Sequence, residues 1–294
     1  MNILMAINHW RNPNSGAAGT IEEIGLRMRD LGHKVHFLFR HDLMTPALRI
    51  NTNLGSISDV PVHLLRKTME SDRGRGPHDI LDISSAEGYL LASQRRRLGL
   101  RGRYIFRSHG LEMREWRDFF LKHSALGQGR FSLKFRLWFP LIRLRQEEKA
   151  LRASDRIMVM CREDLFFLKD TLKIEEGKVA LIPPGVSERL FDYDLRRARD
   201  RDLLFVGWWG SLKGTKYLTK AFEQVTSSHP EATLSVIGSG MEDEIVYASF
   251  PSSLRANVRV RSSLSQEKLF EEYLTHKILV FPSLYEGFGK VFLE

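Results

Sequence analysis

The chain has 294 residues, enough for one large domain or two ordinary ones. Its content of 43% hydrophobic and 28% charged residues excludes a disordered or fibrous protein. A single cysteine, Cys161, excludes a disulfide framework and fits a reducing cytoplasm, and no apolar run approaches the roughly 20 residues of a membrane-spanning helix. The net charge of +9 is regional, because residues 95–145 contain 14 Lys or Arg against 3 acidic residues, a local +11.

The first half of the chain alternates short apolar runs with segments of helical period, which predicts βαβ units and a parallel sheet. In chain order we expect strand 3–7, helix 20–31, strand 34–39, strand 80–83, helix 86–98, strand 104–107, helix 141–153, strand 156–160 and strand 178–182. The charge-dense stretch 192–202 is the best candidate for a linker.

The same pattern restarts after this stretch. We expect strand 203–206, helix 215–226, strand 233–237, strand 258–260, helix 266–274 and strand 278–281. The fold class is therefore α/β, with two doubly wound Rossmann-like domains, 1–191 and 203–294, facing one another. In such a pair, ligands bind at the carboxyl ends of the strands, in the cleft between the domains.

The basic segment 95–145 also carries large apolar side chains between its charges: Phe119, Phe120, Phe131, Phe135, Trp138 and Phe139. Such a surface can attract nucleic acid, an anionic bilayer or an acidic substrate, or it is simply a solvated face. No nucleic-acid recognition motif accompanies it, so we expect no nucleic-acid partner.

The first of three loops at predicted strand ends is 14–19, rich in small residues, with Gly16 and Gly19. Thr20 and Glu23 match a capping box at the start of the helix that follows. The free N–H groups of a helix start favour an anion such as phosphate, although such loops also occur as plain turns. The loop is not a GxGxxG fingerprint and no Walker lysine follows it.

The second and third loops carry charged residues. Lys213 stands in the loop 207–214, just before a helix, where it could neutralise a pyrophosphate or be an ordinary solvated cation. The third loop, 281–290, places Glu286 before a predicted helix start, and Glu294 follows eight positions later, about 12 Å away if the stretch is helical. The two carboxylates would then contact different parts of an extended ligand, unless either only caps or solvates the helix.

The string PSLYEGFGKVFLE resembles the signature of two glutamates separated by seven residues in retaining glycosyltransferases of family 4, which have the GT-B fold. Further strings resemble that family in the same order and cover essentially the whole chain: LGHKV, RSHGLE, IPPGVSERLF, FVGWWGSLKG and VIGSGME. The resemblance implies transfer of a sugar from a nucleotide diphosphate sugar to an acceptor hydroxyl, with retention of the anomeric configuration.

The resemblance also implies roles for individual residues. Glu286 would contact the donor sugar near the reacting centre, and Glu294 would bind the ribose hydroxyls. Lys213 would bind the diphosphate, and His109 would lie beside the transferred sugar. The remaining donor-binding residues would be the backbone amides of Gly287, Phe288 and Gly289 and the N-terminal loop glycines Gly16 and Gly19.

The resemblance implies partners as well. These are a nucleotide-sugar donor and a glycan or lipid-linked acceptor in cell-surface polysaccharide or glycolipid synthesis. The basic and aromatic residues of the segment 95–145 separately predict that it rests on the anionic inner face of the membrane. No cofactor or metal is expected, and we interpret Asp192-Tyr193-Asp194 as solvated linker residues. The alternative is a nucleotide-sugar-binding protein with impaired catalysis.

Two features depart from the family pattern. Trp208 stands where the family usually has an arginine that binds the diphosphate, so either another cation such as Arg261 replaces it or donor affinity is reduced. The sequence also ends at Glu294, where a family member would continue through about two further strand-helix units. We therefore expect an incomplete second domain, with the strand 278–281 as an exposed edge.

Overall fold

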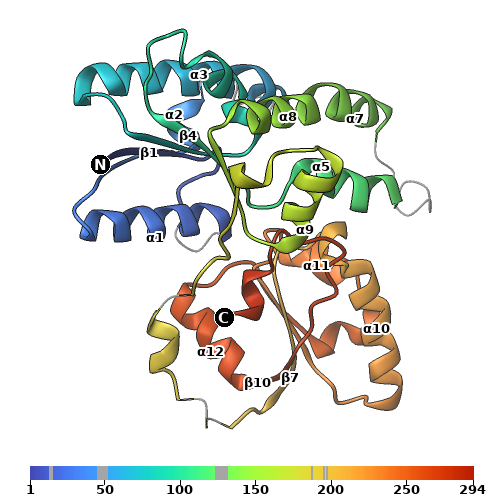
Figure 1. The fold of residues 1–294 in the computed structure, drawn as a ribbon. Coiled ribbons are helices and arrows are strands. Elements are labelled where there is room, and N and C mark those ends of the chain that lie inside the picture. Colours follow the sequence, from blue (N-terminus) through green and yellow to red (C-terminus); the bar gives the residue numbers. More distant parts are fainter. Residues whose placement is uncertain (13–15, 45–51, 123–131, 187, 195, 197) are drawn as a thin grey trace. The chain divides into compact units, whose positions relative to one another are not determined.

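The computed structural model describes residues 1–12, 16–44, 52–122, 132–186, 188–194, 196 and 198–294 (Figure 1). The chain divides into two compact units, residues 1–184 and 185–294, and each is described by itself. The stretch 192–202, expected as a linker, lies in the second unit and overlaps the first residues of its first strand. The predicted bounds 1–191 and 203–294, the cleft and the incomplete second domain stay predictions.

The first unit contains a six-stranded parallel sheet with the order β2-β1-β3-β4-β5-β6. Its strands are β1 (Asn2–Ala6), β2 (Lys34–Leu38), β3 (Ile80–Ser84), β4 (Arg103–Arg107), β5 (Arg156–Val159) and β6 (Val179–Leu181). All six lie where the alternating apolar pattern predicts them, within two residues at either end.

The helices of this unit are α1 (Gly16–Asp30), α2 (Arg40–Leu43), α3 (Thr52–Arg75), α4 (Tyr89–Gln94), α5 (Glu112–Glu115), α7 (Leu133–Trp138), α8 (Leu144–Ala153) and α9 (Arg162–Phe166). Short 3₁₀ turns occur at Ala86–Gly88 and Glu176–Lys178, and π-helical turns at Trp116–Leu121, Phe139–Arg143 and Phe167–Thr171. The stretch from α7 through the π-helical turn to α8 is continuous (Figure 1).

Both faces of the first sheet are covered, as β1 illustrates. Ile3 and Met5 face a core cluster that includes Ile21 of α1, whereas Leu4 and Ala6 face the larger cluster on the other side. Successive side chains of a strand point to opposite faces, so a strand buried on both sides is apolar throughout.

Several helices differ from the prediction, and two of the differences are instructive. The helix expected over 86–98 is a 3₁₀ turn followed by the short helix α4. Helix α3 was not predicted at all, because Gly55, Ser56 and Pro61 interrupt the pattern that usually identifies a helix. Its buried side chains Val60 and Leu64 follow a helical spacing, so packing against the sheet sustains a helix that intrinsic propensity disfavours.

The second unit contains a four-stranded parallel sheet with the order β10-β7-β8-β9. Its strands are β7 (Arg201–Val206), β8 (Leu234–Ile237), β9 (Val258–Arg261) and β10 (His276–Leu279), and its helices are α10 (Thr215–Ser228), α11 (Asp243–Ala248) and α12 (Gln266–Thr275). Strand β10 begins two residues before its predicted start and is an edge strand, with Ile278 57% exposed.

Strand order reverses once in each sheet. In the first sheet the reversal lies between β1 and β3, and in the second between β7 and β10. The loops that leave the carboxyl ends of two such strands diverge to opposite faces and leave room for a ligand. The structure confirms the α/β fold class and gives each unit one ligand-binding edge to examine.

Candidate functional site

The loops after β7 and β10 are held together at the carboxyl edge of the second sheet. The backbone N–H of Leu284 donates a 2.8 Å hydrogen bond to the carbonyl oxygen of Leu212. Gly214 has φ +66°, and a Cβ placed there would lie 2.0 Å from the carbonyl oxygen of Pro282. Only glycine fits this position without displacement, so the two loops are fixed relative to one another.

This contact brings together two of the predicted site residues. The Nζ of Lys213 donates a hydrogen bond to Oε1 of Glu286 in an ion pair, with side chains 25% and 24% exposed. Lys213 Nζ also lies 5.6 Å from the ring centroid of Phe281. A partly exposed lysine and carboxylate thus lie side by side at the point where the strand order reverses.

Helix α10 begins immediately after Lys213, at Thr215, and has 14 residues. The free N–H groups and the dipole at the start of such a helix favour an anion there. Lys213 and the helix start therefore supply positive charge to the same edge of the sheet.

The sequence predicts the start of a helix after Glu286. In the structure, the loop from Glu286 to Lys290 does not begin a long helix. Lys290–Phe292 form a single 3₁₀ turn, and Gly289 before it has φ +82°. The predicted separation of about 12 Å between Glu286 and Glu294 assumed a continuous helix. The structure does not contain that helix, so the assumption is wrong. Among the described residues, none accepts a hydrogen bond from the backbone N–H groups of Gly287, Phe288 and Gly289, so these donors are available to a ligand.

Glu294 makes two contacts within its own unit. Its Oε2 accepts a 3.2 Å hydrogen bond from the hydroxyl of Tyr273 on α12, and its Oε1 lies 3.7 Å from Nζ of Lys290. Burial, followed by the charge of Glu294, raises the pKa of Tyr273. The carboxylate is thus held by protein groups, and its predicted role with ribose stays a prediction.

The two adjacent tryptophans after β7 have different environments. Trp209 is 5% exposed, contacts Phe205 and Phe250, and donates from its indole N–H to Oγ of Ser249 at 3.1 Å. Trp208 is 49% exposed. Trp209 is a core residue, and Trp208 is the one presented at the site edge.

Two glycines make room for the ring of Trp208. A Cβ on Gly210 would lie 2.0 Å from that ring, and one on Gly240 would lie 3.1 Å from it. Arg261, considered as a substitute for the missing arginine, instead forms an ion pair with Glu272 at 3.4 Å. The structure does not support Arg261 as the replacement cation.

The carboxyl edge of the first sheet holds His109. It follows β4, and its Nε2 lies 3.2 Å from Oγ of Ser84 at the end of β3. Burial, with further contributions from Arg107 and His9, lowers the pKa of His109 to about 3. The imidazole is therefore neutral near pH 7 and can exchange hydrogen bonds but cannot supply a positive charge.

A buried polar cluster near the same strand ends was missed from the sequence. Glu87 accepts a 2.9 Å hydrogen bond from Nδ2 of Asn8 and pairs with Arg143 at 3.0 Å. Arg143 also donates to both carboxylate oxygens of Glu112 at 2.6 Å. Asn8 lies directly after a predicted strand, and this position was the available signal, whereas Glu87 lies inside the predicted helix 86–98.

The first loop also differs from its predicted form. Helix α1 begins at Gly16, so Thr20 lies inside it, and its Oγ1 donates to the Gly16 carbonyl at 2.5 Å instead of capping the helix. Gly16 is exposed at the helix start, whereas Gly19 is buried. Asn14 and Ser15 lie outside the described residues.

The basic segment 95–145 is less charged than its sequence suggests, because several arginines are buried beside carboxylates. Arg95 pairs with Asp155 at 2.7 Å and Arg114 with Asp164 at 2.6 Å. Arg107 pairs with Asp82, and Arg143 with Glu87 and Glu112. These pairs are structural, and the remaining positive charge lies on the exposed arginines.

Within the described ranges, no group of three or more His, Cys, Asp or Glu side chains is arranged to hold a metal ion, and Tyr193 of the Asp192-Tyr193-Asp194 string packs against Phe270 at 5.7 Å between ring centroids. No helix in the described ranges has the length and apolar character needed to span a bilayer.

Comparisons with known proteins agree with this geometry. Residues 187–294 match the family model of the glycosyl transferases group 1. Two curated relatives are D-inositol 3-phosphate glycosyltransferases, from Nocardiopsis dassonvillei (27% identical, covering 53% of this chain and 41% of the relative) and Acidothermus cellulolyticus (26% identical, 80% and 55%). The chain thus spans about half the length of these relatives.

Solved structures show the same fold. The catalytic domain of starch synthase IV from Arabidopsis thaliana has a TM-score of 0.64 at 12% identity, over 97% of this chain and 78% of that one. The lipopolysaccharide outer core galactosyltransferase WaaB has a TM-score of 0.62 at 14% identity, over 100% and 77%. The chain therefore has the α/β fold of GT-B glycosyltransferases, and its residues 187–294 are similar to the group 1 glycosyltransferases.

Proposed function

We propose that this chain is a retaining glycosyltransferase of family 4, which transfers a sugar from a nucleotide diphosphate sugar to an acceptor hydroxyl. The observation that carries the proposal is the Lys213–Glu286 pair at the reversal of strand order, inside the region that matches the group 1 glycosyltransferases. The acceptor is a glycan or a lipid-linked glycan of the cell surface, and the donor requires no metal.

The proposed chemistry needs opposite charges at two places. Cleavage of the sugar–phosphate bond builds negative charge on the leaving diphosphate and positive charge on the anomeric carbon. Lys213, the start of α10 and the N–H groups of Gly287, Phe288 and Gly289 stabilise the diphosphate. Glu286 contacts the donor sugar near the reacting carbon.

The remaining assignments follow the same division. His109, as a neutral imidazole, hydrogen-bonds to the transferred sugar, and Glu294 binds the ribose hydroxyls. Gly16 and Gly19 at the start of α1 contact the diphosphate. In the donor-free state Lys213 and Glu286 neutralise one another, and the donor would exchange this contact for contacts of its own.

A binding and transfer experiment tests the proposal. Nucleoside diphosphates and their sugars are screened by thermal shift, and the best ligand is titrated calorimetrically into wild type, Lys213→Met, Glu286→Gln and Lys277→Met. Lys277 is the matched control, because it is also paired with a carboxylate, Asp202 at 2.8 Å, but lies at the amino end of β10.

Loss of a charge-assisted bond to the diphosphate should weaken binding about 10- to 100-fold in Lys213→Met. Glu286→Gln should keep binding within about threefold and reduce transfer at least 100-fold, and Lys277→Met should change neither. Equal weakening by Lys213→Met and Lys277→Met, or no binding of any nucleotide, would contradict the proposal.

A second candidate function is a nucleotide-sugar-binding protein with impaired catalysis. The exposed Trp208 favours this candidate, because it stands where the family that the sequence resembles usually has an arginine. The single N–H of an indole cannot replace the several N–H donors of a guanidinium group. Donor binding with neither transfer nor donor hydrolysis in the same experiment would select this candidate.

Peripheral contact with an anionic membrane is part of the proposed function. Leu133, Leu137 and Leu141 are 71%, 55% and 54% exposed and recur every four residues along the continuous helical stretch that begins with α7. The exposed Arg136 lies beside them. An exposed apolar stripe with flanking arginine is typical of helices that lie in the membrane interface.

Flotation with vesicles containing phosphatidylglycerol tests this contact. Leu137→Ser combined with Leu141→Ser should reduce vesicle binding at least fivefold, whereas Leu31→Ser, which changes a leucine that is 76% exposed beyond α1, should not. Unchanged binding of the double variant would refute the placement. Arg95 is unsuitable for this test because it is buried and paired with Asp155.

A further inference from the structure

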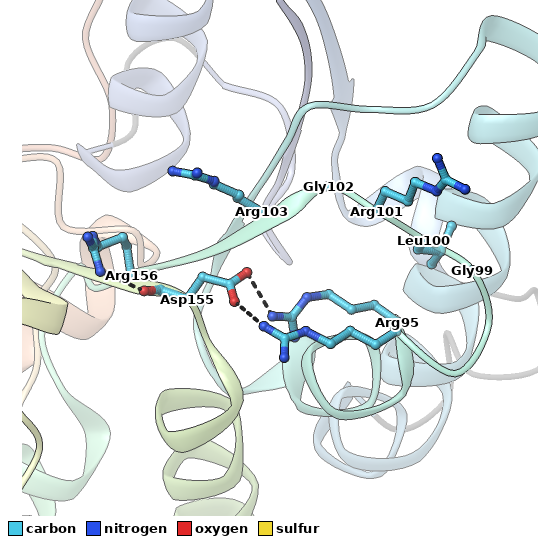
Figure 2. Close-up of a pocket in the computed structure, with 9 residues that line it drawn as sticks. Arg95, Gly99, Leu100, Arg101, Gly102, Arg103, Asp155 and Arg156 are labelled. Carbon is cyan, nitrogen blue, oxygen red and sulfur yellow. Dashed lines mark hydrogen bonds and ion pairs between the residues drawn. The ribbon is translucent and has the colours of Figure 1, made fainter.

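A cavity of about 660 Å³ lies at the amino ends of β4 and β5, the edge of the first sheet opposite to His109 (Figure 2). Its volume is in the range of small-molecule sites. Nothing in the proposed function uses it. It is lined by Arg95, Arg96, Gly99, Leu100, Arg101, Gly102, Arg103, Asp155 and Arg156.

The lining carries a large excess of positive charge. The lining contains five arginines and one carboxylate, that of Asp155. That carboxylate is already occupied, because its Oδ2 accepts from Arg95 at 2.7 Å and from the backbone N–H of Tyr104 at 2.8 Å, and its Oδ1 accepts from Arg96 at 2.9 Å. The cavity therefore has a formal charge of +4 that its own acid cannot neutralise further.

Among the described residues, three of these arginines have no acidic partner. In the part of the chain that the structure describes, no carboxylate forms an ion pair with Arg101, Arg103 or Arg156. The only contact of their guanidinium groups that is found there runs from Nη1 of Arg156 to the backbone carbonyl of Asp155, at 3.3 Å. All three side chains belong to exposed residues, so an anion from solution can reach them.

Strand pairing brings two of the three onto one side. Ile105 of β4 is the partner of Arg156 of β5, so their side chains share a face of the sheet. Arg103, two residues before Ile105, points to that same face, and Figure 2 shows the Arg103 and Arg156 side chains extending in the same direction from their strands. Two guanidinium groups on one face suit an oxyanion that can accept several hydrogen bonds.

The backbone around the cavity is fixed before any ligand arrives. Arg95 is 4% exposed and also donates to the carbonyl of Ala153 at 3.0 Å, which locks the end of α4 to Asp155. Gly99 has φ +76°, and a Cβ on Gly102 would lie 2.8 Å from the backbone carbonyl of His78. The loop between them is therefore tightly placed, and an anion would not have to order it.

We propose that this cavity is a binding site for a phosphate group, in a phosphomonoester or diphosphate, recognised chiefly by Arg103 and Arg156. The fork of a guanidinium matches two phosphate oxygens, and the fixed positive field supplies attraction without a bound cation. The site is separate from the Lys213–Glu286 site and does not depend on the proposed transfer reaction. The phosphate belongs either to a soluble metabolite or to a lipid headgroup.

The test compares Arg103→Gln and Arg156→Gln with Arg97→Gln. Arg97 is an exposed arginine of the same segment that does not line the cavity, so its substitution removes the same charge from the surrounding field. The probes are inorganic pyrophosphate, measured by calorimetry, and flotation with phosphatidylcholine vesicles with or without phosphatidic acid. Because pyrophosphate can also bind the proposed donor site, all calorimetric titrations use the Lys213→Met background, and hydrogen exchange of peptides covering 95–103 and 155–156 localises the binding.

In the Lys213→Met background we expect Arg103→Gln and Arg156→Gln each to weaken binding at least fivefold, and Arg97→Gln to change it less than twofold. Pyrophosphate binding, with vesicle binding that Arg103→Gln and Arg156→Gln leave unchanged, would identify a soluble phosphate compound. Vesicle binding that requires phosphatidic acid and that both substitutions weaken would identify a headgroup. Binding of neither probe, equal weakening by Arg97→Gln, or hydrogen-exchange protection confined to the loops 207–214 and 281–290 would overturn the proposal. The last outcome would leave the proposed donor site intact.

Discussion

The contact between the loops after β7 and β10 makes a quantitative prediction for Gly214→Ala. Alanine at φ +66° costs about 1 to 2 kcal/mol in backbone energy. Its Cβ would also lie 2.0 Å from the carbonyl oxygen of Pro282, so one loop must move, which adds about 1 to 3 kcal/mol. We therefore expect a loss of about 2 to 5 kcal/mol in the unfolding free energy of the second unit.

Gly238→Ala is the matched control in the same unit. Gly238 has φ +71°, but the nearest atom to its added Cβ is the backbone nitrogen of Gly207 at 3.9 Å, an ordinary contact. It should therefore lose only the backbone part, about 1 to 2 kcal/mol. Guanidinium unfolding followed by hydrogen exchange on peptides of 201–289 reads this unit separately. Equal losses in the two variants would refute the reasoning that the loops are in close contact.

Three further substitutions give independent tests. Burial, with the charge of Glu112 second, raises the pKa of Glu115 to about 7. Because the folded state binds this proton more tightly, the group's stabilising effect is complete below pH 4.5 and is lost as the pH rises to 7, by up to about 3 kcal/mol. Glu115→Gln should therefore gain stability relative to wild type at pH 8 but not at pH 4.5 in urea unfolding, and an equal difference at both pH values would contradict this. Trp208→Arg should strengthen nucleoside diphosphate binding about tenfold by calorimetry, since it adds a cation at the edge that holds Lys213; unchanged or weaker binding would refute it. Arg95→Met should lower the unfolding free energy by about 1 to 3 kcal/mol, because it removes the buried partner of Asp155, which still pairs with Arg96. Arg97→Met should be neutral within about 0.5 kcal/mol, and similar losses in both would contradict the structural role of Arg95.

Much of the architecture could be predicted from local sequence. The strands of both sheets are short apolar runs buried on one or both faces, and their period identifies them whatever lies around them. The helix α3 could not be predicted in this way, because its glycine, serine and proline residues disfavour a helix that packing nevertheless sustains. The start of α1 was misplaced for a related reason, since a capping pattern at Thr20 also fits a residue inside a helix.

For the candidate site, the sequence identified individual residues but not the contacts between them. Lys213 and Glu286 could each be selected from their positions after predicted strands, but their direct pairing could not, since 73 positions separate them. Likewise, the sequence offered Arg261 as a substitute cation, but it could not indicate that Arg261 pairs with Glu272 of α12. The sequence gives a local charge of +11 for residues 95–145. It could not show that Arg95, Arg107 and other arginines of this segment are buried in ion pairs, which neutralise part of that charge.

The sequence by itself determined the class of fold, the strand-end positions of the chemical groups and the resemblance to glycosyltransferases, because periodicity and loop motifs are local properties of the chain. Only the tertiary structure decided which charges meet. Ion pairs such as Lys213–Glu286 and Arg95–Asp155 join residues far apart in the sequence, and burial then sets their charge and pKa. The same long-range packing leaves Arg103 and Arg156 without an acidic partner among the described residues, and so forms the proposed phosphate site, which no motif indicates.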